Sequence, residues 1–216
     1  MQKREQILEA AERVFRAKGL SGATTREIAR EVGCADGTLY VHFDDRIALF
    51  LAVLERTLPG FLVPLSALEH KVGKRSVRAN LEEVLHGALG FQNQIMPLIG
   101  GLLAEPELLK NFQNVLRSRN MGPYRSIKAL EEYVGAEQRL GRVPKSIEPR
   151  AVAITLLGAC FYRTFLSHFL GDAMPPDQAT FVASVVGALR LQKNSRATKS
   201  PKPSTTADLS PATKPD

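Results

Sequence analysis

Apolar residues recur every three or four positions along most of the chain, which is the spacing of one face of an α-helix. Such stripes run through residues 7–15, 81–89 and 127–134, and no segment shows the strict alternation of a half-buried strand. Breaks between the stripes coincide with glycine and proline, as at Gly122 and Pro123. The sequence therefore predicts an all-α protein.

The composition fits a soluble protein with a substantial core. The 216 residues are 44% hydrophobic, and the net charge of +7 gives a mild preference for polyanions. The longest strongly apolar run, residues 151–162, is shorter than the roughly 20 residues that cross a bilayer, so we expect a buried helix and no membrane partner. The N-terminus runs directly into an amphipathic pattern without a signal-peptide stretch, which favours a cytoplasmic location.

The sequence offers no pattern typical of catalysis or metal binding. Cys34 and Cys160 lie far apart, with no histidine or cysteine at metal-ligand spacing. We find no nucleophile elbow, phosphate loop or paired-carboxylate arrangement. We therefore expect no enzyme activity, no metal and no cofactor.

The N-terminal region carries the start and stop signals of short helices. A first helix is expected to end at Gly19, and Thr24 with Glu27 then forms a capping box for a second helix over residues 25–32. Gly33 ends that second helix.

A third helix is expected over residues 35–42, and Asp44 and Asp45 can cap a fourth helix whose apolar stripe covers residues 47–58. The second and third helices are joined by a tight turn. That geometry places a recognition helix in the major groove of DNA, although plain structural bundles share it.

These residues resemble the TetR family of repressors, in register and without a gap over about residues 3–50. The rest of the chain is similar to the family only in its helix content and in a late glycine and proline turn. The resemblance implies an N-terminal three-helix helix-turn-helix DNA-binding domain, followed by a helical ligand-binding and dimerisation domain. The matching residues are Arg4, Ile7, Leu8, Ala10, Ala11, Phe15, Gly19, Thr24, Thr25, Ile28, Ala29, Gly33, Gly37, Thr38, Leu39, Tyr40, His42, Phe43 and Leu49.

The resemblance also implies DNA contacts on the second and third helices. Thr25 and Arg26 open the second helix, where a hydroxyl or amide meets phosphate and an arginine can reach a guanine edge. Thr38 and Tyr40 suit phosphate oxygens, and His42 suits phosphate or a base; core packing is the alternative for Tyr40, and capping for His42. The predicted DNA-binding residues are Thr25, Arg26, Ala35, Asp36, Gly37, Thr38, Tyr40, His42 and Arg46.

Three positions in this set depart from the family pattern. Ala35 stands where a small polar residue usually opens the recognition helix, and Arg46 replaces the usual basic residue that pairs with phosphate. Asp36 repels phosphate, so it either reads a cytosine amino group or stabilises the helix N-terminus. Residues 1–50 carry eight basic and eight acidic side chains, which argues against purely electrostatic binding.

The resemblance implies a dimer built from the last two folded helices, expected over residues 149–170 and 177–191. Both helices are too apolar to face solvent, and small residues would let them approach a partner closely. The alternative is that they form the core of a monomer. The predicted interface residues are Ile154, Leu157, Gly158, Phe161, Phe165, Phe181, Val182, Val185, Val186 and Leu189.

A ligand pocket is expected among the middle helices, where apolar walls are interrupted by a few polar groups. An apolar or aromatic small molecule is the expected class of effector. Each candidate taken singly also suits a purely structural role. The candidates are His86, Gln92, Asn93, Met96, Phe112, Tyr124, Tyr162 and His168.

The chain therefore divides into a DNA-binding domain at residues 1–50, a ligand-binding and dimerisation domain at 51–191, and a disordered tail at 192–216 that is rich in Ser, Thr, Pro, Ala and Lys. One dense basic cluster stands outside the first domain, and we read it as a solvated surface rather than a DNA contact. Its members are Lys71, Lys74, Arg75 and Arg78.

The sequence thus predicts a cytoplasmic, nucleoid-associated transcriptional regulator. We expect a homodimeric repressor that a small-molecule effector releases from a near-palindromic operator on double-stranded DNA. The alternative is a DNA-binding adaptor of the same fold that acts through protein partners without a ligand. A cavity with two or three convergent polar groups would favour the sensor, and a filled interior would favour the adaptor.

Overall fold

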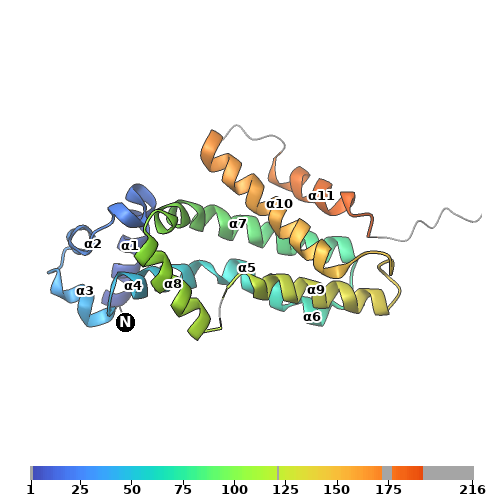
Figure 1. Ribbon diagram of the computed structural model, residues 1–216, viewed down its shortest axis with the longest axis horizontal. Helices are drawn as coiled ribbons and strands as arrows, with labels where there is room; N and C mark the ends of the chain where they lie inside the picture. The colour runs from blue at the N-terminus through green and yellow to red at the C-terminus, as the bar shows by residue number, and fades with distance from the viewer. Residues whose placement is uncertain (1, 121, 172–176, 192–216) are drawn as a thin grey trace, which may run out of the picture.

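The computed structural model describes residues 2–120, 122–171 and 177–191, and every regular element in these ranges is an α-helix. Figure 1 shows an elongated molecule with α2 and α3 at one tip and with α7 and α10 running along its length. The all-α prediction is confirmed, while the tail at 192–216 lies outside the described residues. The helices are α1 Gln2–Gly22, α2 Thr25–Val32, α3 Gly37–His42, α4 Arg46–Thr57, α5 Pro59–Ser66, α6 Leu68–Lys71, α7 Val77–Leu103, α8 Pro106–Ser118, α9 Tyr124–Arg139, α10 Pro149–Leu170 and α11 Gln178–Ala188.

The first helix continues past its predicted end. α1 runs to Gly22, but Gly19 inside it has a φ of 70° and a ψ of 173°, so the helix is kinked there. Glycine adopts a positive φ without the steric cost that a β-carbon adds. The predicted stop at Gly19 is therefore present as a kink, after which one more turn leads to α2.

The capping box of α2 forms as predicted. The amide of Glu27 donates to the Thr24 hydroxyl at 3.2 Å, and the amide of Thr24 donates to the Glu27 carboxylate at 3.1 Å. Hydrogen bonds from the Lys18 ammonium and then from the Thr24 amide lower the pKa of Glu27 to about 2. At its other end α2 stops at Gly33, whose φ of 68° makes the tight turn into α3.

Two neighbouring helices differ slightly from their predicted bounds. α3 begins at Gly37, two residues later than expected, and the Asp36 side chain makes no capping hydrogen bond to it. α4 begins after Asp45, whose carboxylate accepts a hydrogen bond from the Ala48 amide at 2.7 Å. Pro59 stands at the first position of α5, where its missing amide costs nothing.

Two hydrophobic cores are present in the described part of the chain. The first is built by α1 to α4 and is closed by Leu98 and Leu102 of α7 and Leu108 of α8. The second is built by α5 to α7 and α9 to α11. The boundary predicted after residue 50 falls inside α4, which gives Phe50 and Val53 to the first core. The N-terminal bundle of α1 to α4 is therefore packed directly onto α7 and α8.

We expected α10 to be a buried helix, but only one of its faces is buried. Residues such as Leu156 and Cys160 pack into the second core, whereas Phe161 and Phe165 lie on the opposite, exposed face. By length and composition α10 would also pass as a membrane span. The exposed face carries Phe161 and Phe165, which the sequence analysis assigned to a dimer interface.

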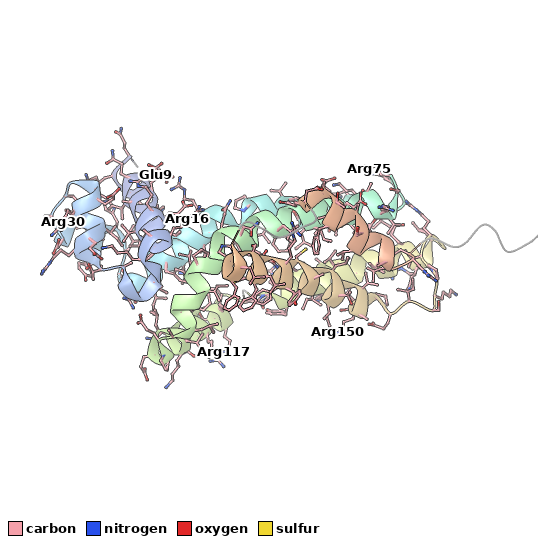
Figure 2. The ribbon with its side chains drawn as sticks, turned by 90° about the horizontal axis from the view of Figure 1, so that it is seen from above. Glu9, Arg16, Arg30, Arg75, Arg117 and Arg150 are labelled. Carbon is pink, nitrogen blue, oxygen red and sulfur yellow. The ribbon has the colours of Figure 1, made fainter. Side chains whose placement is uncertain are left out.

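The basic cluster lies at the end of the molecule opposite the helix-turn-helix. Figure 2 shows Arg75 at one end and Arg30 of α2 at the other. Lys71 and Arg75 both pair with Glu83, at 2.6 and 2.7 Å, and these contacts lower the pKa of Glu83. Three residues of the cluster, Lys71, Arg75 and Arg78, are thus ion-paired, and the cluster lies away from the helix-turn-helix.

Gly87 lets α7 pack closely on the start of α5. A β-carbon here would lie 2.6 Å from the backbone oxygen of Gly60 and 3.3 Å from the Cα of Phe61. Alanine normally stabilises a helix interior by roughly 0.5–1 kcal/mol relative to glycine. At Gly87 it must push α5 away, so we expect Gly87→Ala to lower the free energy of unfolding by about 1–3 kcal/mol.

Urea unfolding followed by circular dichroism measures this effect. The matched control is Gly90→Ala in the same helix, where nothing lies within 4 Å of the added carbon, so it should stabilise the protein. Two substitutions that shifted stability in the same direction would contradict the close approach of α7 and α5.

Candidate nucleic-acid interface and ligand pocket

α3 presents an exposed surface at the tip of the molecule (Figure 1). Tyr40 is 56% exposed and Val41 is 80% exposed, while Leu39 between the helices is buried. Thr38 and His42 are half-buried on either side of this surface. The exposure of Tyr40 rules out the core-packing alternative, so its hydroxyl is available to an outside partner.

Asp36 lies against Arg26 rather than against the end of its own helix. The Asp36 carboxylate accepts a hydrogen bond from Arg26 Nε at 3.3 Å, and both side chains are more than half exposed. The Asp36 side chain makes no capping hydrogen bond to α3, and the predicted effect of its charge on the helix N-terminus stays a prediction. Because an exposed pair contributes only about 0–1 kcal/mol, a DNA phosphate or base can displace it. In the free protein the pair neutralises Arg26.

The structure gives Arg46 a different partner from the expected phosphate. Its guanidinium donates to Glu105 at 2.7 Å, and the two side chains are only 28% and 34% exposed. A second pair, Arg119 with Glu55 at 3.1 Å, joins the end of α8 to α4. Sequence reasoning missed both links, because their partners are 59 and 64 residues apart. Arg46 therefore connects α4 to α8 and is not a free phosphate contact in this conformation.

Two exposed residues of this surface are absent from the predicted set. Arg30 lies four positions after Arg26, hence on the same face of α2, and it is exposed at the tip of the molecule (Figure 2). Helical spacing from Arg26 could have found it. Val41 follows Tyr40 directly on α3, but an apolar residue in an apolar pattern reads as core from sequence alone.

A pocket of about 380 Å³ opens between α7, α10 and α11. This volume is at the lower end of the range of about 300–1,000 Å³ for small-molecule sites. Of the predicted ligand residues, Asn93 and His168 line it, and His86 reaches Gln178 at its edge, with 3.3 Å between the two nitrogens. The lining residues are Leu89, Asn93, Arg163, Thr164, Ser167, His168 and Gln178.

The other five predicted ligand residues do not line this pocket. Phe112 packs against the first hydrophobic core, and Tyr124 and Tyr162 are 51% and 64% exposed. Gln92 and Met96 are half-buried along α7. Periodicity assigned these residues to helices, but it could not tell which faces of distant helices meet.

The predicted dimer residues of α10 lie on its exposed face. Ile154, Gly158, Phe161 and Phe165 are exposed, and Leu157 is half-buried against the second core. Phe165 stacks on Phe169, with 6.0 Å between the ring centroids. Tyr162, predicted as a ligand residue, is exposed beside this face as well. Such a continuous aromatic surface is unusual on a free protein surface and is typical of an interface.

The predicted dimer residues of α11 divide into two groups. Val182 and Val186 are 0% and 3% exposed in the second core, so they cannot contact a partner; this part of the prediction is wrong. Phe181, Val185 and Leu189 are half-buried, and each keeps an edge at the surface. The α11 residues were predicted as one set because periodicity gives each residue's angle around the helix axis but not which side packs on the chain's own core.

The N-terminal region matches a known family model. Residues 7–53 match the model of bacterial regulatory proteins of the tetR family. The HTH-type transcriptional repressor BepR of Brucella suis is 42% identical over 53 residues, which are 24% of this chain and 25% of that protein. The chain thus matches about a quarter of the length of this curated relative.

Solved structures are similar over most of the fold. SmeT, the repressor of the Stenotrophomonas maltophilia multidrug efflux pump SmeDEF, has a TM-score of 0.65 and 18% identity, over 96% of this chain and 97% of that chain. FadR of Bacillus subtilis, solved with stearoyl-CoA, has a TM-score of 0.63 and 16% identity, over 86% and 96% of the two chains. At these identities the likeness concerns the fold: an N-terminal helix-turn-helix carried by a larger helical domain.

Proposed function

We propose that this chain is a TetR-family transcriptional regulator rather than an enzyme, and that it is a homodimeric repressor released from a near-palindromic operator by a small-molecule effector. The observation that carries the proposal is the exposure of Tyr40 and Val41 on α3, at the tip farthest from the ion-paired basic cluster. A two-fold dimer would present its two recognition helices about 34 Å, or a multiple of that, apart on DNA. A cytoplasmic location at the nucleoid and the absence of a membrane partner belong to the same proposal.

Each residue of the tip has a role in this proposal. The Tyr40 hydroxyl, with those of Thr25 and Thr38, positions the protein on phosphates, and Gly37 lets the start of α3 approach the backbone closely. Val41 meets a thymine methyl in the major groove, and Arg26 reads a guanine edge. His42 contacts a phosphate or base at the end of α3, and Ala35 contributes only contact area.

Asp36 should restrain binding to DNA of any sequence, because its carboxylate neutralises Arg26 and repels phosphate. We expect Asp36→Asn to raise the affinity for random duplex DNA several-fold and to steepen its salt dependence by about one counterion.

Arg26→Ala should instead relax the base preference at one position per half-site, at a cost of about 1–3 kcal/mol for the preferred base. Fluorescence anisotropy against duplexes at several salt concentrations measures both.

The matched control is Glu31→Gln, the same change of charge on α2 in a side chain that pairs with Arg13 of α1 at 3.0 Å. It should leave the salt slope unchanged. A specificity profile that Arg26→Ala did not alter, in a folded protein, would remove Arg26 from the base-reading residues.

The proposed function as a whole is tested by selecting the genomic fragments that the purified full-length protein retains. A repressor of this kind should enrich one near-palindromic sequence, protected over two half-sites in footprinting. Enrichment of fragments without a common motif would contradict sequence-specific repression.

The pocket between α7, α10 and α11 supports the sensor over the adaptor, because several polar groups converge on one cavity. α8 is the element best placed to pass an effector's influence on, since it is joined to α4 at both of its ends. An adaptor would keep its DNA affinity whatever small molecule occupied that cavity. Titrating the operator complex with a small molecule that occupies this cavity, and measuring the affinity for DNA, therefore separates the sensor from the adaptor.

A further inference from the structure

Arg46 carries its positive charge at a place where such a charge is normally disfavoured. It is the first residue of α4, and the partial positive charge of a helix N-terminus repels a guanidinium. The carboxylate of the preceding residue, Asp45, is engaged by the Ala48 amide at 2.7 Å. The anion that meets Arg46 is Glu105, whose Oε2 accepts a hydrogen bond from Arg46 Nη2 at 2.7 Å. Arg46 therefore occupies a position that favours an anionic partner.

Glu105 reaches Arg46 instead of stabilising the helix that it begins. It is the N-cap residue of α8, where the helix dipole and the first amides attract a carboxylate. Its backbone is extended, with a φ of −117° and a ψ of 96°, but its side chain makes no capping hydrogen bond. A carboxylate that left Arg46 could turn back to the start of α8. Glu105 therefore has a second resting place, provided that Arg46 meets another anion.

Arg46 lies close to the surface that the recognition helix exposes. Only residues 43–45 separate it from α3, whose Tyr40 is 56% exposed, and Figure 1 shows α3 and α4 next to each other at the same end of the molecule. The side chains of Arg46 and Glu105 are 28% and 34% exposed, so the pair is open to solvent on one side. A phosphate of a duplex that α3 engages could therefore approach Arg46 in competition with the Glu105 carboxylate.

We propose that Glu105 is a positioning residue of the DNA-binding surface, which competes with a DNA phosphate for Arg46. Because Glu105 belongs to α8 and Arg46 to α4, the placement of α8 then sets how strongly the protein holds DNA of any sequence. Phosphate contacts orient a protein on DNA without reading bases, so the competition changes affinity and leaves base preference as it is. The proposal rests on the proposed function only in that this end of the molecule binds duplex DNA.

Glu105→Gln in the full-length protein tests the competition, because it removes the charge and keeps the shape of the side chain. We expect the affinity for random duplex DNA, measured by fluorescence anisotropy, to rise several-fold. The plot of log affinity against log salt concentration should steepen by about one counterion per subunit, since a released Arg46 adds one phosphate contact. A substitution that only loosened α8 would not steepen this salt dependence.

The matched control is Glu55→Gln, which removes the same charge from the other ion pair between α4 and α8. Glu55 pairs with Arg119 at 3.1 Å, and that arginine lies at the far end of α8. Its release adds no cation beside α3, so the salt dependence should stay unchanged. Arg46→Gln should lower the affinity for all sequences alike, and Glu105→Gln added to it should have no further effect.

The outcomes separate the competition from the proposed function. Unchanged binding in Glu105→Gln, an equal change in Glu55→Gln, or an equal gain with and without Arg46 would overturn the competition alone. Wild-type protein that bound no duplex DNA would reject the proposed function as well. Circular dichroism checks that each variant is folded, and if Glu105→Gln is not, Glu105→Asp replaces it: the shorter side chain withdraws the carboxylate from Arg46 and should give a smaller gain in affinity.

Discussion

Phe161→Glu is expected to convert the protein from dimer to monomer and to lower its affinity for a two-half-site operator by at least about 100-fold. Phe161 is 48% exposed in the middle of the aromatic face of α10, so a carboxylate there would have to be buried, unpaired, against the partner. Loss of the second half-site then removes the gain that linked binding provides. Analytical ultracentrifugation measures the oligomeric state, and gel shifts compare one half-site with two.

The control is Val63→Glu, which places the same charge on an exposed apolar residue of α5, on a helix outside the aromatic face. That variant should stay dimeric. Helix content should be unchanged in both proteins, because neither side chain is part of a hydrophobic core. A dimeric Phe161→Glu protein would show that α10 does not form the interface, and the exposed aromatic face would then need another partner.

Signals that act within one turn of chain were sufficient to predict local structure. The Thr24 and Glu27 capping box, the stop at Gly33 and the bounds of α10 all appear where the sequence places them. Each depends on residues a few positions apart, whose geometry the helix itself determines. The same reasoning found the helix-turn-helix, whereas its expected DNA contacts came from the family resemblance and left out the exposed Arg30.

Contacts between distant helices could not be predicted in this way. Arg46 is basic and follows the recognition helix, yet its partner is Glu105 on α8 rather than a phosphate. Two predicted pocket residues, Asn93 and His168, do meet, but Tyr124 and Tyr162 face outward. Helical periodicity fixes a residue's angle around its own axis and says nothing about which neighbouring helix covers that angle.

Phe50→Ala is expected to destabilise the N-terminal core by about 3–5 kcal/mol and to abolish DNA binding. Phe50 is 1% exposed, and its ring packs edge-on to Phe15 of α1 at 6.0 Å and against Phe112 of α8 at 5.6 Å. The substitution leaves a cavity where three helices meet and removes two aromatic contacts. Since whole domains are stable by only about 5–15 kcal/mol, this loss should unfold the tip at moderate temperature.

The same substitution tests how the DNA-binding end is joined to the rest of the protein. α8 is attached to α4 through Arg46 and Glu105 at its start and through Arg119 at its end, with the ring of Phe50 in between. Loss of that ring should therefore increase amide hydrogen exchange in α8 (Pro106–Ser118) as well as in α1 to α4. A pocket ligand that moved α8 would then move α4 and the recognition helix with it.

Phe91→Ala is the matched control for this last prediction. Phe91 is half-buried, and its ring stacks on that of Phe61 with 5.7 Å between the centroids. The substitution therefore removes a comparable aromatic contact from the second core. It should raise exchange in α5 and α7 and leave α1 to α4 protected. If hydrogen exchange in α8 were unchanged in Phe50→Ala, the two ion pairs would hold α8 in place without the aromatic contact. The route from the pocket to the recognition helix would then have to run through the end of α7, where Leu98 and Leu102 close the first core.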